Sequence, residues 1–356
     1  MTAVTPLKPA PPESASRAPP PVASALELIG RTPVIEVTHA FDTGPCRLFI
    51  KLESSNPGGS IKDRIALTMI EAAEKDGRLK PGGTIVEATA GNTGLGLAQV
   101  GILKGYKLVL VVPDKMAREK ILNLRAMNVD VRLTRSDVGK GHPEYYQDMA
   151  QTLAQSIPGA IYVNQFENPA NPDAHEKTTA PEIWAQLEGR IDGFTCAAGT
   201  GGTLAGVGMG LKAFDEDVTI ALTDPYGAAL YNYYAHGELK AEGSSVAEGI
   251  GQGRITANLD GAPVDTQFRV SDEEGIAWVR RLLSEEGLCL GLSSGINVAG
   301  AVELGRRLVA EGRGGPDRPV RVATILCDTG FRYLSSLYNR AWLEAKGLPV
   351  FPWLAA

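Results

Sequence analysis

The chain has 356 residues, of which 44% are hydrophobic and 21% are charged, and its formal net charge at pH 7 is -6. These values are ordinary for a soluble globular protein of one or two domains. The acidic balance and the lack of a long basic run argue against nucleic acid or an anionic membrane as a partner. No apolar stretch approaches the roughly 20 residues that a bilayer-spanning helix needs.

The first 24 residues are expected to form a disordered tail. They are rich in proline, alanine and serine and offer almost nothing to bury. A secretory signal requires an apolar core, which this segment lacks. A transit peptide also fits poorly, because Lys8 and Arg17 are the only basic residues and prolines are frequent. We therefore expect a cytoplasmic protein.

The cysteines and histidines are scattered and predict no metal site. No two cysteines have CxxC spacing, and no two histidines are three or four positions apart. We expect the cysteines to be reduced and buried, as is usual in the cytosol. The residues concerned are Cys46, Cys196, Cys289, Cys327, His39, His142, His175 and His236.

In chain order, short β-rich runs alternate with helical patterns. The first block predicts strands at 46–53, 83–89, 107–113 and 129–134, with helices at 63–79, 92–105 and 118–128. This βαβα order is typical of a mostly parallel sheet with helices on both faces.

The pattern then restarts. The second block predicts strands at 191–199, 218–225 and 320–328, with helices at 181–187, 202–214, 272–287 and 295–312. The two blocks meet near residues 162–172. The predicted fold class is therefore α/β with two sheet units, and the cleft between them is the expected ligand site.

Three glycine-rich turns each follow a predicted strand and open a helix, at 87–94, 197–206 and 290–297. The start of a helix presents unpaired N–H groups and the positive end of the helix dipole, which together bind anions. The turn at 199–203 is the sharpest and adds two hydroxyl donors. It is not the dinucleotide motif G-x-G-x-x-G, because Leu204 and Leu211 occupy the sixth position in the two registers. The segment GGSIKDR also lacks the Gly-Lys-Ser/Thr of a Walker A loop.

Lys62 lies in the bend NPGGSIKDRIA, where an extended segment becomes a helix. On local sequence alone it could be a surface lysine at a helix start. A phosphate site together with a lysine held in a bend indicates pyridoxal phosphate instead. That cofactor needs a lysine for its Schiff base, an anion cup, a partner for the ring nitrogen and a donor at the ring hydroxyl.

Seven motifs carry a resemblance to a known family. The chain resembles the fold-type II pyridoxal-phosphate enzymes, and within them the cysteine synthase and cystathionine β-synthase group, over roughly residues 25–345. In order, the motifs are NPGGSIKDRIA, TAGNTGLGLA, VNQFENPANPDAHEKTT followed by PEIW, GTGGTLAGVG, EGIG, SSG and DTGFRYLS.

The resemblance implies roles for individual residues. Lys62 would form the Schiff base, Asn92 would hydrogen-bond the ring hydroxyl, and Ser293 would contact the ring nitrogen. The implied phosphate cup consists of Gly199, Thr200, Gly201, Gly202 and Thr203. The implied substrate site consists of Thr89, Ala90, Gly91, Asn92, Thr93, Gln165, Gly249 and Ile250, of which the last two belong to a mobile segment ending at Gly251.

The resemblance also implies an architecture like that of the tryptophan synthase β-subunit. A larger cofactor-binding domain would comprise residues 25–60 and 170–345. A smaller mobile domain, 61–169, would carry the lysine and the substrate loop, and 346–356 would be a C-terminal tail. Members of the family are usually homodimers, so we expect one here.

The implied chemistry is β-replacement on an activated serine. Lys62 would remove the Cα proton, and loss of the β-substituent would leave an aminoacrylate to which sulfide or a thiol adds. A neutral Ser293 beside the ring nitrogen favours elimination and replacement over transamination. Ala90 stands where the family often has serine, which leaves the identity of the substrate open.

We predict a cysteine synthase that converts O-acetylserine and sulfide to cysteine and acetate. The alternatives within the family are a cystathionine β-synthase and a cysteine β-lyase. An alternative of another class is an NAD-dependent dehydrogenase, which Asp224 after a strand would suit. A dehydrogenase would need the dinucleotide motif, whose glycine at the sixth position is missing here, and it would give Lys62 no role. A catalytically silent scaffold would not need Lys62, Asn92 and Ser293 together.

Overall fold

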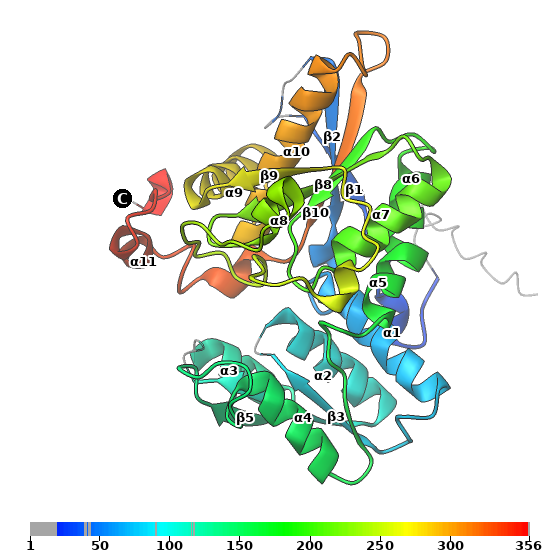
Figure 1. The fold of residues 1–356 in the computed structure, drawn as a ribbon, viewed down its shortest axis with the longest axis vertical. Helices are drawn as coiled ribbons and strands as arrows, with labels where there is room; N and C mark the ends of the chain where they lie inside the picture. Colours follow the sequence, from blue (N-terminus) through cyan, green and yellow to red (C-terminus); the bar gives the residue numbers. More distant parts are fainter. Residues whose placement is uncertain are drawn as a thin grey trace, which may run out of the picture.

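The structure is a computed structural model that describes residues 20–38, 41, 44–89, 91–114, 116 and 118–354. Its strands form two sheets, one of six strands and one of four, with helices packed around each (Figure 1). The α/β class and the two mostly parallel sheets predicted from the sequence are confirmed. The expected disordered tail lies almost wholly outside the described residues.

The four-stranded sheet has the order β5-β4-β3-β6, and all its strands are parallel. Five successive residues of β4 are buried, as expected for a parallel strand covered on both faces. Helices α1 and α2 pack on one face, and α4 packs on the other. The elements of this unit are α1 (Lys62–Lys75), β3 (Thr84–Ala88), α2 (Asn92–Lys104), β4 (Lys107–Pro113), α3 (Arg118–Ala126), β5 (Asp130–Thr134), α4 (Tyr146–Ser156) and β6 (Ala160–Tyr162).

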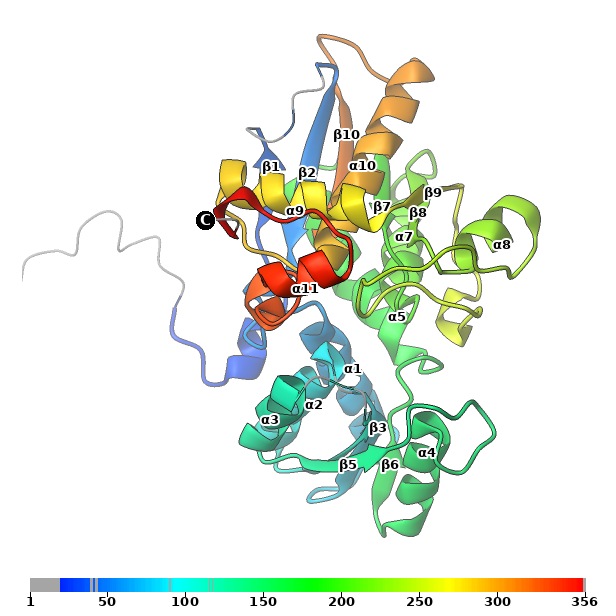
Figure 2. The same cartoon turned by 90° about the vertical axis from the view of Figure 1, so that its left-hand side faces the viewer.

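The six-stranded sheet has the order β1-β2-β10-β7-β8-β9, and only the β1–β2 pair is antiparallel. Helices α6 and α7 cover one face, while α9 and α10 cover the other (Figures 1 and 2). Its strands are β1 (Val34–Val37), β2 (Cys46–Leu52), β7 (Gly193–Cys196), β8 (Thr219–Pro225), β9 (Thr266–Val270) and β10 (Val320–Leu326). Its helices are α5 (Ala170–Ala174), α6 (Ala180–Gln186), α7 (Gly202–Phe214), α8 (Leu230–His236), α9 (Asp272–Glu286), α10 (Leu292–Ala310) and α11 (Arg340–Ala345).

Several elements were missed by the sequence prediction, and most of them are short. They are β1, β6, β9, α4, α5, α8, α11 and a π-helical turn at His175–Thr179. In β9 only the two end residues are buried, so the strand has no continuous apolar run to reveal it. Helix α10 begins at Leu292 rather than at Gly295, which places Ser293 inside its first turn.

The C-terminal segment that the sequence analysis set apart as a tail packs on the larger unit. Phe351 is fully buried, and its ring lies 5.5 Å from that of Tyr338. The domain boundaries at 60/61 and 169/170 stay predictions. Within the described part of the chain, no helix is both long and apolar enough to cross a membrane.

Candidate active site

The predicted site residues lie at the carboxyl ends of strands in both sheets, which is where α/β folds place their ligands. Lys62 begins α1 just after β2 and a short 3-10 turn, and the 199–203 turn follows β7. The loop at 89–93 follows β3, and Gln165 follows β6. The larger unit contacts the Gln165 turn directly, because the Asn258 side-chain amide donates to the Gln165 carbonyl at 2.8 Å.

A cavity joins Lys62 to the predicted phosphate cup. Its volume is about 20 Å³, which is room for about one water molecule. The lining residues are Ile61, Lys62, Cys196, Ala197, Gly199, Thr200, Gly201, Thr203, Gly249, Ile250, Asn297, Ile325 and Cys327.

The cup has the donor set that a phosphate needs. The first N–H groups of α7 have no partner within the helix, and Gly201, the residue before it, provides no side-chain cap. A Cβ on Gly199 would lie 2.1 Å from the Gly249 carbonyl oxygen, and one on Gly202 would lie 2.0 Å from Asn171 Oδ1. Gly201 has φ +85°, which side chains disfavour. These backbone positions therefore admit only glycine and leave N–H groups open to an anion.

The hydroxyl groups of the cup are also held in place. The Asn171 amide donates to Thr200 Oγ1 at 2.9 Å, so the Thr200 hydroxyl keeps its own hydrogen for an acceptor. Thr203 Oγ1 lies 3.2 Å from Nε2 of the buried His175. Burial, with the nearby cations of Arg64 and Lys62, holds the pKa of His175 well below its usual value. The imidazole is therefore neutral and fixes Thr203 without adding charge.

The bend before Lys62 is closed by the first turn of α1. Asp63 Oδ2 accepts the Gly58 N–H at 2.5 Å, and a Cβ on Gly58 would collide with that carboxyl group. Burial raises the pKa of Asp63 to about 6, although the Gly58 N–H and the Arg332 cation oppose the rise. The local sequence thus sets the position from which the half-buried Lys62 side chain extends.

Asn92 does not line the Lys62 cavity, because its side chain is engaged by the segment after β10. Its amide donates to Asp328 Oδ2 at 2.7 Å, and its carbonyl oxygen accepts from Arg332. Tyr333 donates to the same Asp328 oxygen, and Arg332 also donates to the Gly58 carbonyl. Burial raises the pKa of Asp328 against the hydrogen bonds from Asn92 and Tyr333.

Ser293 is buried in the first turn of α10 and faces a second small cavity beside the first. The Cys327 thiol, which lines the Lys62 cavity, lies next to it. Burial raises the pKa of Cys327 to about 11, so the thiol is neutral at physiological pH. The Asn297 amide, which also donates to the Ile325 carbonyl, lies 3.4 Å from the sulfur atom.

Hydrogen bonds join the predicted substrate residues in two pairs. Thr93 Oγ1 donates to Gln165 Oε1 at 2.6 Å, and the Gly91 N–H donates to Thr89 Oγ1 at 3.2 Å. Ala90 lies outside the described residues. Gly249 and Ile250 close the cavity on the other side, next to Gly199.

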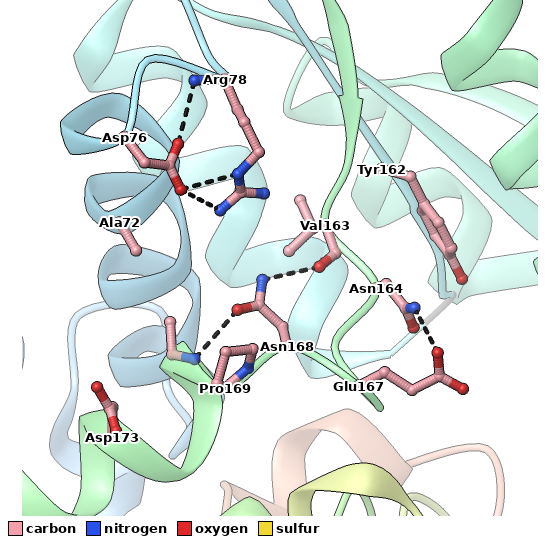
Figure 3. A pocket seen from close by; sticks show the side chains of 11 residues that line it. Ala72, Asp76, Arg78, Tyr162, Val163, Asn164, Glu167, Asn168, Pro169 and Asp173 are labelled. Atoms are coloured by element: carbon pink, nitrogen blue, oxygen red, sulfur yellow. Dashed lines mark hydrogen bonds and ion pairs between the residues drawn. The ribbon is translucent and has the colours of Figure 1, made fainter.

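The turn that carries Gln165 is stiffened by side chains on both sides of it (Figure 3). Asn168 donates to the Val163 carbonyl at 2.8 Å and accepts the Ala170 N–H at 3.1 Å, while Asn164 donates to Glu167. The outer side of this turn borders a hollow of about 410 Å³. None of the predicted site residues lines that hollow, so it is separate from the Lys62 cavity.

Several neighbours of the site were not predicted from the sequence. His175, Asp328 and Arg332 lie inside motifs that carried the resemblance, but no role was assigned to them. The motifs could therefore have pointed to these residues. Cys196 and Asn297 had no signal in the sequence. Asp224, which a dehydrogenase would need at a ribose, is buried and accepts the Tyr231 N–H at 2.8 Å.

Comparisons with known proteins agree with this geometry. A family model described as "Pyridoxal-phosphate dependent enzyme" matches residues 25–328. Cysteine synthase 1 of Emericella nidulans is 46% identical over 327 residues, which are 90% of this chain and 86% of that protein. The crystal structure of an O-acetylserine-dependent cystathionine β-synthase from Helicobacter pylori is 34% identical, with TM-score 0.78 over 88% of this chain and 98% of its own. A hydrogen sulfide-producing enzyme from Fusobacterium nucleatum is 33% identical, with TM-score 0.77 over the same shares of the two chains.

Proposed function

Because this chain belongs to the family of pyridoxal-phosphate-dependent enzymes, we propose that it is a cysteine synthase that replaces the β-acetoxy group of O-acetylserine with sulfide. The observation that carries the proposal is the meeting of Lys62 and the 199–203 cup in one cavity. The identity of 46% to a cysteine synthase over most of both chains supports the choice of reaction.

Pyridoxal phosphate, when bound, supplies an electron sink for the Cα carbanion of the substrate. The chain's own residues do the rest. The α7 N-terminus and the hydroxyls of Thr200 and Thr203 hold the phosphate. The neutral Ser293 hydroxyl would contact the ring nitrogen and add no negative charge there. The Asn92 amide, held by Asp328, keeps a second hydrogen for the ring hydroxyl.

Lys62 carries the proton in this reaction. It would hold the cofactor through Nζ, and the same amine would take the proton from the substrate Cα. Thr89, Gly91, Asn92 and Thr93 bind the substrate carboxylate, with Gln165 fixed by Thr93. Ala90 brings no hydroxyl to this loop. Gly249 and Ile250 cover the bound substrate and exclude water.

The smaller unit, 61–169, moves against the larger one to admit substrate. The protein acts in the cytoplasm as a homodimer and takes a small amino acid together with sulfide or a thiol. It uses no metal ion.

The first test of this function is the absorbance of the protein after incubation with pyridoxal phosphate. We expect a band near ~410 nm, and Lys62→Ala removes it because no other amine replaces Nζ. Borohydride reduction of the wild-type protein fixes the added mass on the peptide that contains Lys62. A protein that stays colourless, or a band that persists in Lys62→Ala, contradicts the proposal.

Cystathionine β-synthase activity is the second candidate, because the structure resembles one that uses O-acetylserine. Because the structure is also similar to a hydrogen sulfide-producing enzyme, cysteine β-lyase activity is a further alternative. O-acetylserine, serine and cysteine are each offered with sulfide or homocysteine, and the products are identified. Cysteine from O-acetylserine and sulfide is the expected main product. Turnover only with homocysteine, or only release of sulfide from cysteine, would assign the alternative reaction.

A further inference from the structure

Glu87 is a carboxyl group that the chain buries completely near the end of β3. Its Oε1 accepts the Ala88 N–H at 2.7 Å, and its Oε2 accepts the Gln165 N–H at 3.0 Å. The Asn164 N–H is a third donor. Among the residues that the structure describes, no lysine or arginine forms an ion pair with it. Burial raises the pKa of Glu87 to about 7, and these three N–H groups oppose the rise.

A buried carboxyl group without a cationic partner lowers stability unless its hydrogen bonds compensate. Here those bonds reach two different segments. Strand β3 leads into the substrate loop at 89–93, and its parallel neighbour β6 leads into the turn that carries Gln165. Glu87 therefore spans the exits of both strands and links the two segments through their backbones.

Gln165 passes this link on to the rest of the site. Its side-chain oxygen accepts from Thr93 in the loop. Its backbone carbonyl accepts the side-chain amides of Asn171 and Asn258 at 2.8 Å each. Both of these amides also donate to Thr200 in the cup. The cup is thus held by hydrogen bonds from residues other than Gln165, such as those from Asn171 and Asn258 to Thr200. The substrate loop, in contrast, contacts the Gln165 turn through the hydrogen bond from Thr93.

We propose that Glu87 is a positioning residue that holds Gln165 against the substrate loop, so that the loop keeps the shape that binds an amino-acid carboxylate. This inference rests on the proposed function, because it concerns the same substrate site. Without the acceptor at Oε2, the Gln165 turn moves away from Thr93, and the loop loses a side-chain partner. The cup, with its other supports, keeps its affinity for phosphate.

The test uses Glu87→Gln, which keeps the shape but turns an amide NH2 towards an N–H group that needs an acceptor. L-Alanine is the probe, because it has the carboxylate and amine of the substrate but no leaving group. Its dissociation constant is measured from the absorbance change of the enzyme loaded with pyridoxal phosphate. We expect it to rise about two- to tenfold, as for the loss of one hydrogen bond, while cofactor affinity stays near the wild-type value.

Asp224→Asn is the matched control. Asp224 is also a buried carboxyl group bonded to backbone N–H, and its pKa is raised to about 6 by burial, but it lies in β8 of the other sheet. This variant should bind L-alanine as the wild type does. The inference is wrong if Glu87→Gln binds L-alanine as tightly as Asp224→Asn does. It is also wrong if Glu87→Gln loses affinity for L-alanine and for pyridoxal phosphate to the same extent.

A double variant separates positioning from general loss of structure. If Glu87 acts through Gln165, then Glu87→Gln adds little to the loss already caused by Gln165→Ala. Independent, additive losses would contradict that route. Should Glu87→Gln fail to fold, Glu87→Asp, which keeps the charge but withdraws it from the Gln165 N–H, undergoes the same measurements. A wild-type protein that binds neither pyridoxal phosphate nor L-alanine would refute the proposed function itself.

Discussion

At the scale of single residues, the site depends on positions where no side chain fits and on groups whose charge is suppressed. Gly199 and Gly202 bring backbone N–H groups to the cup because a Cβ at either position would collide with neighbouring atoms. His175 and Cys327 are both kept neutral by burial, so neither side chain adds charge beside the 199–203 turn. The proposed binding of an anion here would therefore depend on backbone geometry as much as on side-chain chemistry.

Gly199→Ala tests this reliance on backbone geometry. The new Cβ would lie 2.1 Å from the Gly249 carbonyl oxygen, so the cup or the 249–251 segment must shift. We expect pyridoxal phosphate to bind about 1–3 kcal/mol more weakly, the usual cost of overpacking, as measured by fluorescence titration. Gly253→Ala is the control, because a Cβ there meets no atom within 4 Å. Equal affinities of the two variants would show that the cup tolerates the displacement.

At the scale of elements, α1 holds Lys62 in place through a buried group of charges. The Arg64 guanidinium forms two hydrogen bonds with Glu53, after β2, and two with Glu182 in α6. Lys51 of β2 pairs with the same Glu182 carboxylate at 2.8 Å. Burial opposes ionisation of Glu182, but Arg64 and Lys51 hold its pKa near 2. The first turn of α1 is therefore fastened to the six-stranded sheet two residues after Lys62.

Arg64→Met should destabilise the fold strongly, because it leaves two carboxylates short of their cation. A loss of about 3–5 kcal/mol in the free energy of unfolding is expected for breaking a buried pair, as measured by urea denaturation. Arg64→Lys keeps the charge without the planar fork and should fall between Arg64→Met and the wild type. Arg78→Met is the control, since its pair with Asp76 is about half exposed and worth at most about 1 kcal/mol. If Arg64→Met and Arg78→Met lose a similar amount of unfolding free energy, the buried network stabilises the fold no more than an exposed ion pair does.

At the scale of the whole molecule, the two sheets meet around the site through a small number of long-range contacts. Arg332 reaches Asn92 across the boundary, and Lys120 of α3 pairs with Glu248 beside the segment that covers the cavity. The Lys120 amine also lies 5.7 Å from the centre of the Tyr333 ring. The Lys120–Glu248 pair is partly exposed, so it holds the two units together only modestly.

We expect salt to weaken this contact. Screening at high ionic strength reduces the attraction between Lys120 and Glu248, so the KM for O-acetylserine should rise as salt is added to the wild type. The effect should correspond to about 0.2–1 kcal/mol, the usual range for an exposed pair, and Glu248→Gln should abolish it. Steady-state assays at low and high salt provide the measurement, with Asp173→Asn, which removes the exposed Lys177–Asp173 pair, as control. A salt effect that persists unchanged in Glu248→Gln would assign it to another contact.

The sequence by itself determined the α/β class, the family and the local shape of the site. Motifs such as GTGGT and NPGGSIK define tight turns through glycine and a helix start, and these depend on interactions within a few residues. The tertiary structure alone decided which distant groups surround those turns. Asn92 meets Asp328 across 236 positions, and Glu87 meets the Gln165 N–H across 78. Such pairs result from strand order and helix packing, so the hydrophobic periodicity of the sequence cannot predict them.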